Sequence, residues 1–386
     1  MSKVFLSKCT DYDLKQIEDK IRSGFSALGG DKYIRTFIKE NSRILLKPNM
    51  LVGDKKASLA TTHYIFFEAV IRVLKDYSQN IIYGDSPGFG EVFKSAQVLG
   101  LQEVAEKYNV KFENFNKECL TISYKDGILC KSFDIAKAAY ECDVLITLPR
   151  IKTHSMMLFT GSIKNQFGCI PGVKKTQFHA RMQNVENFSK MLLDLNGLLK
   201  TDFSILDGII AMEGNGPKNG DPYNLNCILM GDDIVAVDSV ATKLIGYDNP
   251  TDTPVLREAA KYGIGETNLS KIEILGDKLE DLIVHDFKLI MKKQHSSLFY
   301  IATHNDTIKK IFIPKPKLNP EKCIGCKRCN EVCPKKDEVI KFVSKNGKLT
   351  PSWNMNKCIT CFCCQELCPT GAIYAKQSLI QKLLDK

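Results

Sequence analysis

The last seventy residues hold two consecutive runs of the form Cys-x2-Cys-x2-Cys-x3-Cys-Pro, and this repeat constrains the chain more than any other feature. The first run extends from Cys323 to Pro334 and the second from Cys358 to Pro369. Two-residue gaps allow three thiolates of one run to bind the same [4Fe–4S] cube, and in bacterial two-cluster modules the fourth Cys of each run binds the other cube. The spacing therefore predicts two [4Fe–4S] clusters in a C-terminal bacterial ferredoxin-like α+β domain.

This exchange of the fourth cysteine divides the ligands into two sets. The first cluster is predicted to bind Cys323, Cys326, Cys329 and Cys368, and the second Cys358, Cys361, Cys364 and Cys333. Zinc is the alternative metal, but zinc sites usually take two ligands from each of two separate stretches, whereas this spacing with its proline occurs twice. We therefore favour iron–sulfur clusters over zinc.

The length of the chain, 386 residues, exceeds what one hydrophobic core usually serves, so we expect two domains. We assign residues 1–310 to an α/β domain that binds a substrate or a partner, and residues 318–386 to the ferredoxin-type domain. Residues 311–317, Ile-Phe-Ile-Pro-Lys-Pro-Lys, are expected to form a linker, because proline fixes φ and removes a backbone donor.

The remaining composition predicts the compartment. No stretch approaches about eighteen uninterrupted apolar residues, and the N-terminus lacks the apolar segment of a secretion signal. Apart from the eight predicted ligands, the chain contains the cysteines Cys9, Cys119, Cys130, Cys142, Cys169, Cys227 and Cys363. Free thiols beside cluster ligands indicate a reducing environment. We therefore expect a cytoplasmic protein with no membrane partner, in an anaerobic host.

The net charge of +10 is concentrated near the C-terminus, where the last seventy residues contain thirteen Lys and Arg against six Asp and Glu. Two oxidised clusters with their thiolates subtract about four charges, which leaves this module mildly positive. A basic electron-transfer surface favours an acidic electron donor such as a ferredoxin or flavodoxin. Nucleic acid is the competing partner, but the lysines are dispersed and no nucleic-acid-binding motif is visible, so we favour the acidic donor.

Short apolar segments alternate with amphipathic ones along the N-terminal region. Residues 43–47, 80–84 and 143–148 are predicted strands, and residues 62–77 and 133–140 are predicted helices. This order is typical of βαβ units, and we therefore expect an α/β fold with a mainly parallel sheet. The third strand should be central, because a continuous run of Val, Leu and Ile suits a sheet that is covered on both faces.

Polar loops follow several predicted strands, and open α/β sheets bind ligands beyond the carboxyl ends of their strands. These loops comprise residues 47–49, 84–87, 150–154, 161–175 and 207–217. Their cationic, amide and hydroxyl side chains are the candidate substrate-binding residues: Lys47, Asn49, Ser86, Arg150, Lys152, Lys164, Asn165, Lys174 and Asn215. Arg150 and Lys152 suit a carboxylate or phosphate in particular. The loops therefore predict a pocket for a small anionic substrate.

Four further residues are candidates for catalysis. His154 and His179 are expected to deliver a proton near neutral pH, and Asp85 and Glu213 to act as acid or base or to bind a metal. Each also has an ordinary structural explanation, since such residues occur in turns, on surfaces and in satisfied cores. The position of the loops after successive strands is what favours a functional role.

Two glycine-rich loops are close to nucleotide-binding motifs without matching them. Residues 168–176 have the wrong Gly spacing and Lys position for a phosphate loop. Residues 214–220 are one residue too long for a dinucleotide fingerprint and come too late in the chain. We therefore predict no NAD site and no flavin site.

Seven strings between residues 40 and 246 carry a family resemblance. They are Lys47-Pro-Asn, Gly84-Asp-Ser-Pro-Gly, residues 143–154, residues 160–168, Leu206-Asp-Gly-Ile, Met212-Glu-Gly-Asn-Gly-Pro and Ala236-Val-Asp. In these strings the chain resembles the iron–sulfur proteins that carry domain of unknown function 362, which a C-terminal ferredoxin module commonly accompanies. The resemblance implies this domain order and a shared pocket, and it brings no reaction.

Three functions fit these features. The one we favour is an enzyme, a ferredoxin-dependent oxidoreductase that passes single electrons through both clusters to an anionic substrate in the α/β domain. The alternative is an electron carrier or accessory protein that docks a partner or a cofactor. A purely structural role for the clusters is the weakest hypothesis, because a staple does not need two redox centres.

Overall fold

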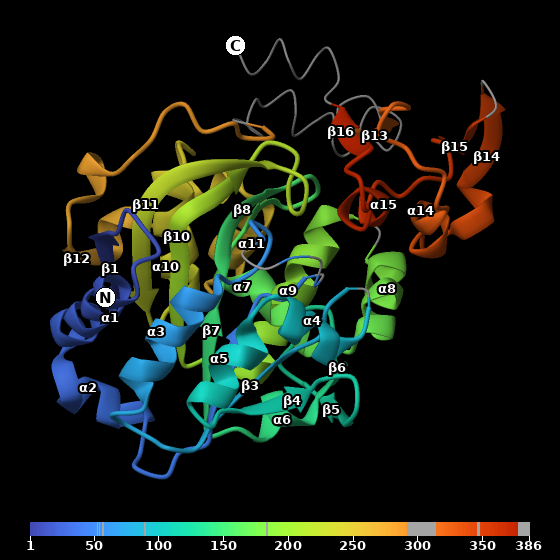
Figure 1. The fold of residues 1–386 in the computed structure, drawn as a ribbon. Coiled ribbons are helices and arrows are strands. Elements are labelled where there is room, and N and C mark those ends of the chain that lie inside the picture. Colours follow the sequence, from blue (N-terminus) through green and yellow to red (C-terminus); the bar gives the residue numbers. More distant parts are fainter. Residues whose placement is uncertain are drawn as a thin grey trace.

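The computed structural model describes residues 1–51, 53, 55, 58–88, 90–182, 184–291, 314–345 and 348–376. Within them, the N-terminal region forms a ten-stranded sheet flanked by helices, and the C-terminal region forms two small two-stranded sheets. Figure 1 shows the C-terminal region at one corner of the α/β domain, above α8 (Gly172–Arg181). The predicted fold class, a mainly parallel α/β domain followed by a small ferredoxin-like region, is confirmed.

The main sheet has a path of eight strands. Their order is β12 (Ile272–Gly276), β1 (Ser2–Lys8), β11 (Asp221–Gly231), β10 (Phe203–Glu213), β7 (Val144–Leu148), β2 (Ile44–Pro48), β3 (Ile81–Asp85) and β4 (Lys111–Asn114). Only β11 runs antiparallel to its neighbours on this path. Off the path, β8 (Arg150–His154) pairs in parallel with β10 and antiparallel with β9 (Leu158–Thr160).

Helices cover both faces of this sheet. They are α1 (Leu14–Leu28), α2 (Gly30–Phe37), α3 (Tyr64–Leu74), α4 (Val92–Val98), α5 (Leu101–Lys107), α6 (Lys137–Glu141), α7 (Ser162–Asn165), α8, α9 (Val185–Leu199), α10 (Ile234–Leu244) and α11 (Pro254–Tyr262). Strand β7 is apolar except for Thr147 because both of its faces are covered: Val144 and Ile146 pack into the core beneath α1 and α3, while Leu145 packs into the core beneath α9 and α11. Alternate side chains of a strand point to opposite faces, so a central strand needs apolar residues at both. None of the described helices has the length and apolar character needed to cross a membrane.

Three segments of the α/β domain differ from the sequence-based expectation. Residues 150–154 form strand β8, and β10 continues to Glu213, although both segments were expected to be loops. Their polar side chains are buried and bonded inside the domain, which a hydrophobicity pattern does not reveal. Residues 133–136 belong to β6 (Ser132–Ala136), paired with β5 (Cys119–Ser123), and not to a helix. Phe133, Ile135 and Ala136 are its buried residues, and the first two show the period of two that is typical of a strand.

The C-terminal region consists of short elements around the cysteine runs. They are β13 (Lys315–Leu318), α14 (Arg328–Glu331), β14 (Ile340–Lys345), β15 (Lys348–Trp353), α15 (Cys363–Glu366) and β16 (Ile373–Lys376). Strand β13 pairs with β16 inside the segment 311–317 that was expected to be a linker. Both strands of a two-stranded sheet are edge strands, where Pro316 is tolerated. Residues 311–313 lie outside the described part of the chain, and the remaining domain limits stay a prediction.

The turn between β5 and β6 is held to α9 by one carboxylate. Asp194 accepts hydrogen bonds from the backbone N–H groups of residues 128–130 at 2.5, 2.8 and 2.7 Å. The variant Asp194→Ala should lower the free energy of unfolding by about 3 kcal/mol, because several buried donors lose a charged acceptor. Urea denaturation followed by circular dichroism measures this. Asp126→Ala removes an exposed carboxylate of the same turn and should change the midpoint little; equal losses would contradict the assignment.

Candidate functional site

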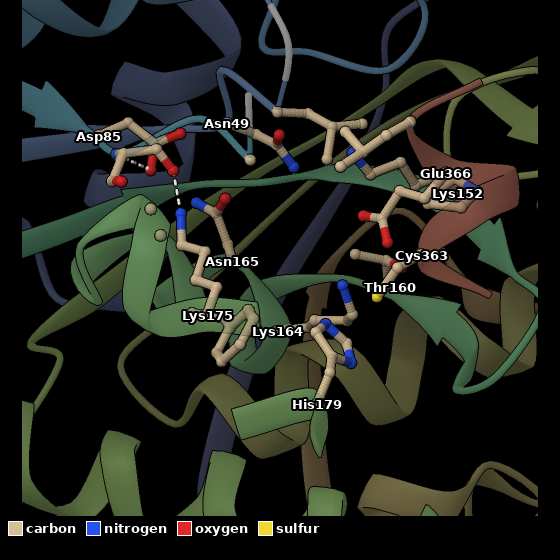
Figure 2. Close-up of a pocket in the computed structure, with 18 of the residues that line it drawn as sticks. Asn49, Asp85, Lys152, Thr160, Lys164, Asn165, Lys175, His179, Cys363 and Glu366 are labelled. Atoms are coloured by element: carbon tan, nitrogen blue, oxygen red, sulfur yellow. Dashed lines mark hydrogen bonds between the residues drawn. The ribbon is translucent and has the colours of Figure 1, made fainter. Parts of the chain in front are cut away.

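A pocket of about 90 Å³ lies between the carboxyl edge of the parallel sheet and the C-terminal region (Figure 2). The α/β domain contributes Asn49, Leu51, Asp85, Ser86, Gly88, Lys152, Thr160, Lys164, Asn165, Phe167, Gly168, Gly172, Lys175, His179 and Pro217. The C-terminal region contributes Val332, Cys363, Glu366 and Leu367. Its two walls come from the two parts of the chain, and ligand sites often lie at such junctions.

Three lysines make this pocket basic. Lys152, on β8, is buried and donates to the carbonyl oxygen of Ala60; burial and the charge of Lys164 lower its pKa to about 7. Lys175, on α8, donates to the carbonyl oxygen of Ser86, and burial lowers its pKa to about 8. Within the described parts of the chain, the ammonium group of Lys164 has no hydrogen-bond or ion-pair partner. Burial of Lys152 outweighs the nearby charges of Glu366 and Asp85, and burial of Lys175 outweighs that of Asp85. Additional negative charge would therefore stabilise both ammonium groups.

Asp85 lines the pocket and is held by an ion pair and by backbone hydrogen bonds. Its carboxylate lies 2.7 Å from the buried Lys47 ammonium and accepts from the backbone N–H groups of Met50 and Ser86 at 2.7 and 2.8 Å. Gly168 packs against this ion pair, and a Cβ there would stand 1.9 Å from Asp85 Oδ1. The carboxylate is thus fully engaged in joining β2, β3 and the turn after α7, and Lys47 is its partner, not a residue of the pocket lining.

Three polar residues of the predicted set line the pocket: Asn49 after β2, Ser86 after β3 and Asn165 on α7. Asn165 donates to the carbonyl oxygen of Lys47 and to Thr147 Oγ1, so α7 is joined to the central strands. Ser86 donates to Asn116 Oδ1 at 2.8 Å, and Asn49 lies nearby in the loop after β2.

The start of α7 is held by a buried carboxylate. Asp238, on α10, accepts hydrogen bonds from the backbone N–H groups of Ser162 and Ile163 at 2.6 and 3.0 Å. Burial raises its pKa to about 7. Asp238 thereby fixes the helix that carries Lys164 and Asn165 into the pocket.

Both candidate histidines are buried, and only His179 lines the pocket. Its ring stacks on Phe188 at 4.8 Å, its Nδ1 has no partner within the described chain, and burial lowers its pKa to about 4. In His154, Nδ1 accepts from the backbone N–H groups of Met156 and Met157, and burial holds its pKa well below the usual value. Both rings are therefore neutral at pH 7, which does not fit the expectation that a histidine delivers the proton.

Arg150 lies in the interior, outside the lining of the pocket. Its guanidinium donates to the carbonyl oxygens of Ser58, Thr61 and Ile210 at 2.9, 3.1 and 2.9 Å, and Asp207 lies 3.8 Å away. The guanidinium is engaged by the protein itself. Arg150 therefore holds the loop after β2 against β10.

Three further candidates also lie outside the pocket. Glu213 accepts from the backbone N–H and the ammonium of Lys288 at 2.8 and 3.0 Å. Lys174 lies on α8 but forms an ion pair with Asp134 at 2.6 Å. Asn215 accepts a hydrogen bond from Gln365, so it helps to hold the C-terminal region in place.

The C-terminal region is anchored by the loop of the second cysteine run. Phe362 is buried in the core shared with α9 and α11, and Gln365 donates to the carbonyl oxygen of Gly216 at 3.2 Å. Asn219 donates to the carbonyl oxygen of Cys368 at 3.5 Å. These contacts bring Cys363 and Glu366 to the pocket, two residues that the sequence analysis did not include in the site.

Other lining residues missed from the sequence belong to the α/β domain. Thr160 is buried with an Oγ1 that has no hydrogen-bond partner among the described residues. Lys175 and Phe167 fall in the loop 161–175 that was expected to reach the site, but they were not selected from it. Their position in that loop was the only available signal, because α8 turns Lys175 inward and Lys174 outward.

The first set of predicted cluster ligands surrounds a second, smaller cavity. Cys323, Cys326, Cys329 and Cys368 all line it, together with apolar residues such as Ile324 and Phe342. Among the described residues, no three His, Cys, Asp or Glu side chains converge on one point as they would around a single metal ion. Thiolates that line a cavity fit a cube, whose ligands stand around four irons.

The second set of ligands lies beside the pocket. Burial, and then the charges of Cys361 and Cys333, raise the pKa of Cys358 to about 11, so these thiols are close neighbours. Burial, and then the charges of Cys361, Cys358 and Cys333, also raise the pKa of Cys364 well above its usual value. Their sequence neighbours Val332 and Cys363 line the pocket, and this set therefore lies next to it.

Comparison with known proteins relates this chain to several others. A thylakoid-associated protein of Synechocystis sp. is 29% identical over 287 residues, which cover 74% of this chain and 87% of that protein. A crystal structure of a Thermotoga maritima protein has a TM-score of 0.35 and 13% identity, covering 56% of each chain. The lactate racemase apoprotein of Thermoanaerobacterium thermosaccharolyticum has a TM-score of 0.38 and 12% identity, covering 60% of this chain and 54% of its own. This chain thus spans little more than half the length of these two structures.

Two family matches account for most of the chain. Residues 44–243 match the domain of unknown function DUF362, and residues 315–369 match a 4Fe-4S dicluster domain. The second match indicates iron–sulfur clusters and electron transfer in the C-terminal region. The first spans half of the chain, and this protein therefore belongs to the DUF362 family, with a C-terminal ferredoxin-type domain.

Proposed function

We propose that this protein is an oxidoreductase that passes single electrons from two [4Fe–4S] clusters to a small anionic substrate in the pocket between its two parts. The observation that carries the proposal is the composition of the pocket. One wall presents the buried lysines of the α/β domain, and the other presents Cys363 and Leu367, which adjoin the cluster ligands Cys364 and Cys368. A substrate bound there would touch both the cationic residues and the wall that holds the second cluster.

The charge balance of the pocket supports an anion as the substrate. Lys152, Lys164 and Lys175 bring three ammonium groups. The charge of Asp85 is opposed by Lys47, which leaves Glu366 as the other lining carboxylate. Burial disfavours ammonium groups that lack a counter-charge, so a carboxylate or phosphate would be bound with a gain for each lysine it contacts.

The pocket also contains groups suited to proton transfer. When bound, the clusters would supply electrons one at a time at low potential. The ammonium groups of Lys152 and Lys175, with pKa values of about 7 and 8, match proton donation near neutral pH. His179 is neutral there and would accept or donate a hydrogen bond through its unpartnered Nδ1. The lysines thus replace the histidines as proposed proton donors.

An electron carrier or accessory protein is the alternative. The relative from Synechocystis is described as thylakoid-associated, and that description concerns the relative. For the present chain, a cytoplasmic location and an anaerobic host stay predictions. A carrier would not need the pocket lysines, so their replacement separates the two functions.

Lys164→Gln should weaken the binding of small anions by about 10- to 100-fold, because it removes one charged hydrogen bond. Isothermal titration with inorganic phosphate and succinate measures this on the anaerobically purified protein. Lys174→Gln is the matched control, since Lys174 lies on the neighbouring helix but is paired with Asp134 outside the pocket. Equal affinities for the two variants would contradict the proposed anion site.

Anion affinity should also depend on pH. The lysines bind an anion in their charged form, which is populated below the pKa values of about 7 for Lys152 and about 8 for Lys175. Affinity should therefore be greatest near pH 6 and fall as the pH rises through both values, by up to about tenfold per unit for each lysine. Titrations between about pH 6 and 9 check this direction. A constant affinity would show that neither lysine contacts the anion.

The ligand assignment is tested at two adjacent cysteines. Cys364→Ala should remove about half of an expected total of about eight irons per chain, because Cys364 is a predicted ligand of the second cluster. Cys363→Ala should retain all of them. Iron and sulfide analysis with electron paramagnetic resonance after dithionite reduction gives the answer. Equal iron loss in both variants, or stoichiometric zinc in the unmodified protein, would overturn the assignment.

A further inference from the structure

The two sets of cluster ligands differ in what surrounds them. The second set adjoins the pocket, where Phe362, between two of its ligands, is buried in the α/β core at 3% exposed, although Cys333, Cys358 and Cys361 themselves are half-buried. In the first set Cys323, Cys329 and Cys368 are buried, and the set reaches the surface at its fourth ligand. Cys326 is exposed, and Ile324, which lines the same cavity, is 64% exposed. An exposed aliphatic side chain next to a redox centre is a feature of a contact surface.

Positive charge is also asymmetric between the two runs. The first contains Lys327 and Arg328 among its cysteines and is preceded by Lys322, whereas no Lys or Arg lies between Cys358 and Cys368. Glu321 and Glu331 are the acidic residues near the first run, and cations outnumber them.

The hairpin of β14 and β15 extends this basic surface. Lys348 donates to the carbonyl oxygen of Pro320 at 3.1 Å, which places its ammonium beside the start of the first run. Lys327 lies over the ring of Phe342 at 5.9 Å. Leu349, 37% exposed, follows Lys348, and its carbonyl oxygen approaches Gly325. The result is an apolar centre of Ile324 and Leu349 bordered by lysines.

We propose that this surface, defined by Lys322, Ile324, Lys327, Lys348 and Leu349, docks a small acidic electron-transfer protein that delivers electrons to the first cluster. The proposal rests on the proposed function, because it supplies the electrons that the pocket consumes. In each encounter the reduced donor loses one electron and this protein gains one, with no bond made or broken. Electrons thus enter on the exposed side and leave on the side of the pocket.

The geometry favours a protein donor over nucleic acid. An aliphatic centre with a short border of lysines matches a compact partner that carries carboxylates around its own redox centre. A nucleic acid would call for a continuous basic groove with aromatic side chains on which bases stack. Long-range attraction between opposite charges would raise the rate of encounter and would weaken with salt.

The test is stopped-flow reduction of the cluster-loaded full chain by a reduced acidic bacterial ferredoxin, with no substrate present. The double variant Lys322→Glu/Lys327→Glu should slow reduction at least about tenfold at low salt, and the effect should shrink as salt rises. The control Lys341→Glu/Lys357→Glu has the same change of charge elsewhere. Lys341 neighbours Phe342 on β14 and so points away from the cavity that Phe342 lines. This control should reduce at nearly the rate of the unmodified protein.

Reduced methyl viologen, a small cation, separates docking from damage to the clusters. It should reduce both double variants at least as fast as the unmodified protein. Equal slowing of both variants by the ferredoxin, or none, would overturn the docking surface while leaving the pocket proposal intact. Binding of a single-stranded RNA oligonucleotide that the first variant abolishes, with ferredoxin reduction unaffected, would assign the surface to nucleic acid and also overturn the proposal. A protein without iron would instead refute the proposed function itself.

Discussion

The insertion of one loop of the C-terminal region into the α/β domain is the interaction on which the candidate site depends. Phe362 is buried in the core beneath α9 and α11, and Gln365 bonds to the turn that contains Asn215 and Gly216. Phe362 lies between two predicted ligands of the second cluster. Burial of a large aromatic side chain contributes about 2 to 3 kcal/mol and thus fixes the cluster-binding loop at the edge of the sheet.

The wall of the pocket that the α/β domain forms is held in place by buried carboxylates. Asp85 joins Lys47 to the backbone of two loops, while Asp238 fixes the start of α7. These carboxylates are satisfied by the protein, so they position the site and do not react in it. The lysines that face the cavity are in a different state, because burial lowers the pKa of Lys152 and Lys175 more than the nearby carboxylates raise it. The carboxylates thus stabilise the loops, while the lysines are the side chains that can bind a ligand.

Together these features suggest a direction for the flow of charge through the proposed reductase. Cys326 of the first set lies at the lysine-bordered surface, and the second set adjoins a pocket lined by both parts of the chain. In the proposed reductase such a fused module would remove one diffusional encounter, because the final donor would lie next to the substrate. The walls of the pocket would also limit the access of water to the reacting groups.

The sequence by itself determined the two cysteine runs with the ligand pattern that they predict, the mainly parallel α/β class and the polar loops after β2 and β3. These features depend on local residue spacing and hydrophobic periodicity, which the sequence shows directly. It predicted Asn49, Ser86, Lys152, Lys164 and Asn165 as lining residues from their place after strands. Only the tertiary structure decided that Arg150 and Glu213 are engaged elsewhere and that Lys175, not Lys174, turns inward. It alone brought Cys363 and Glu366 to the site. Burial and docking arise from contacts between residues that are distant in the chain, and no local pattern records them.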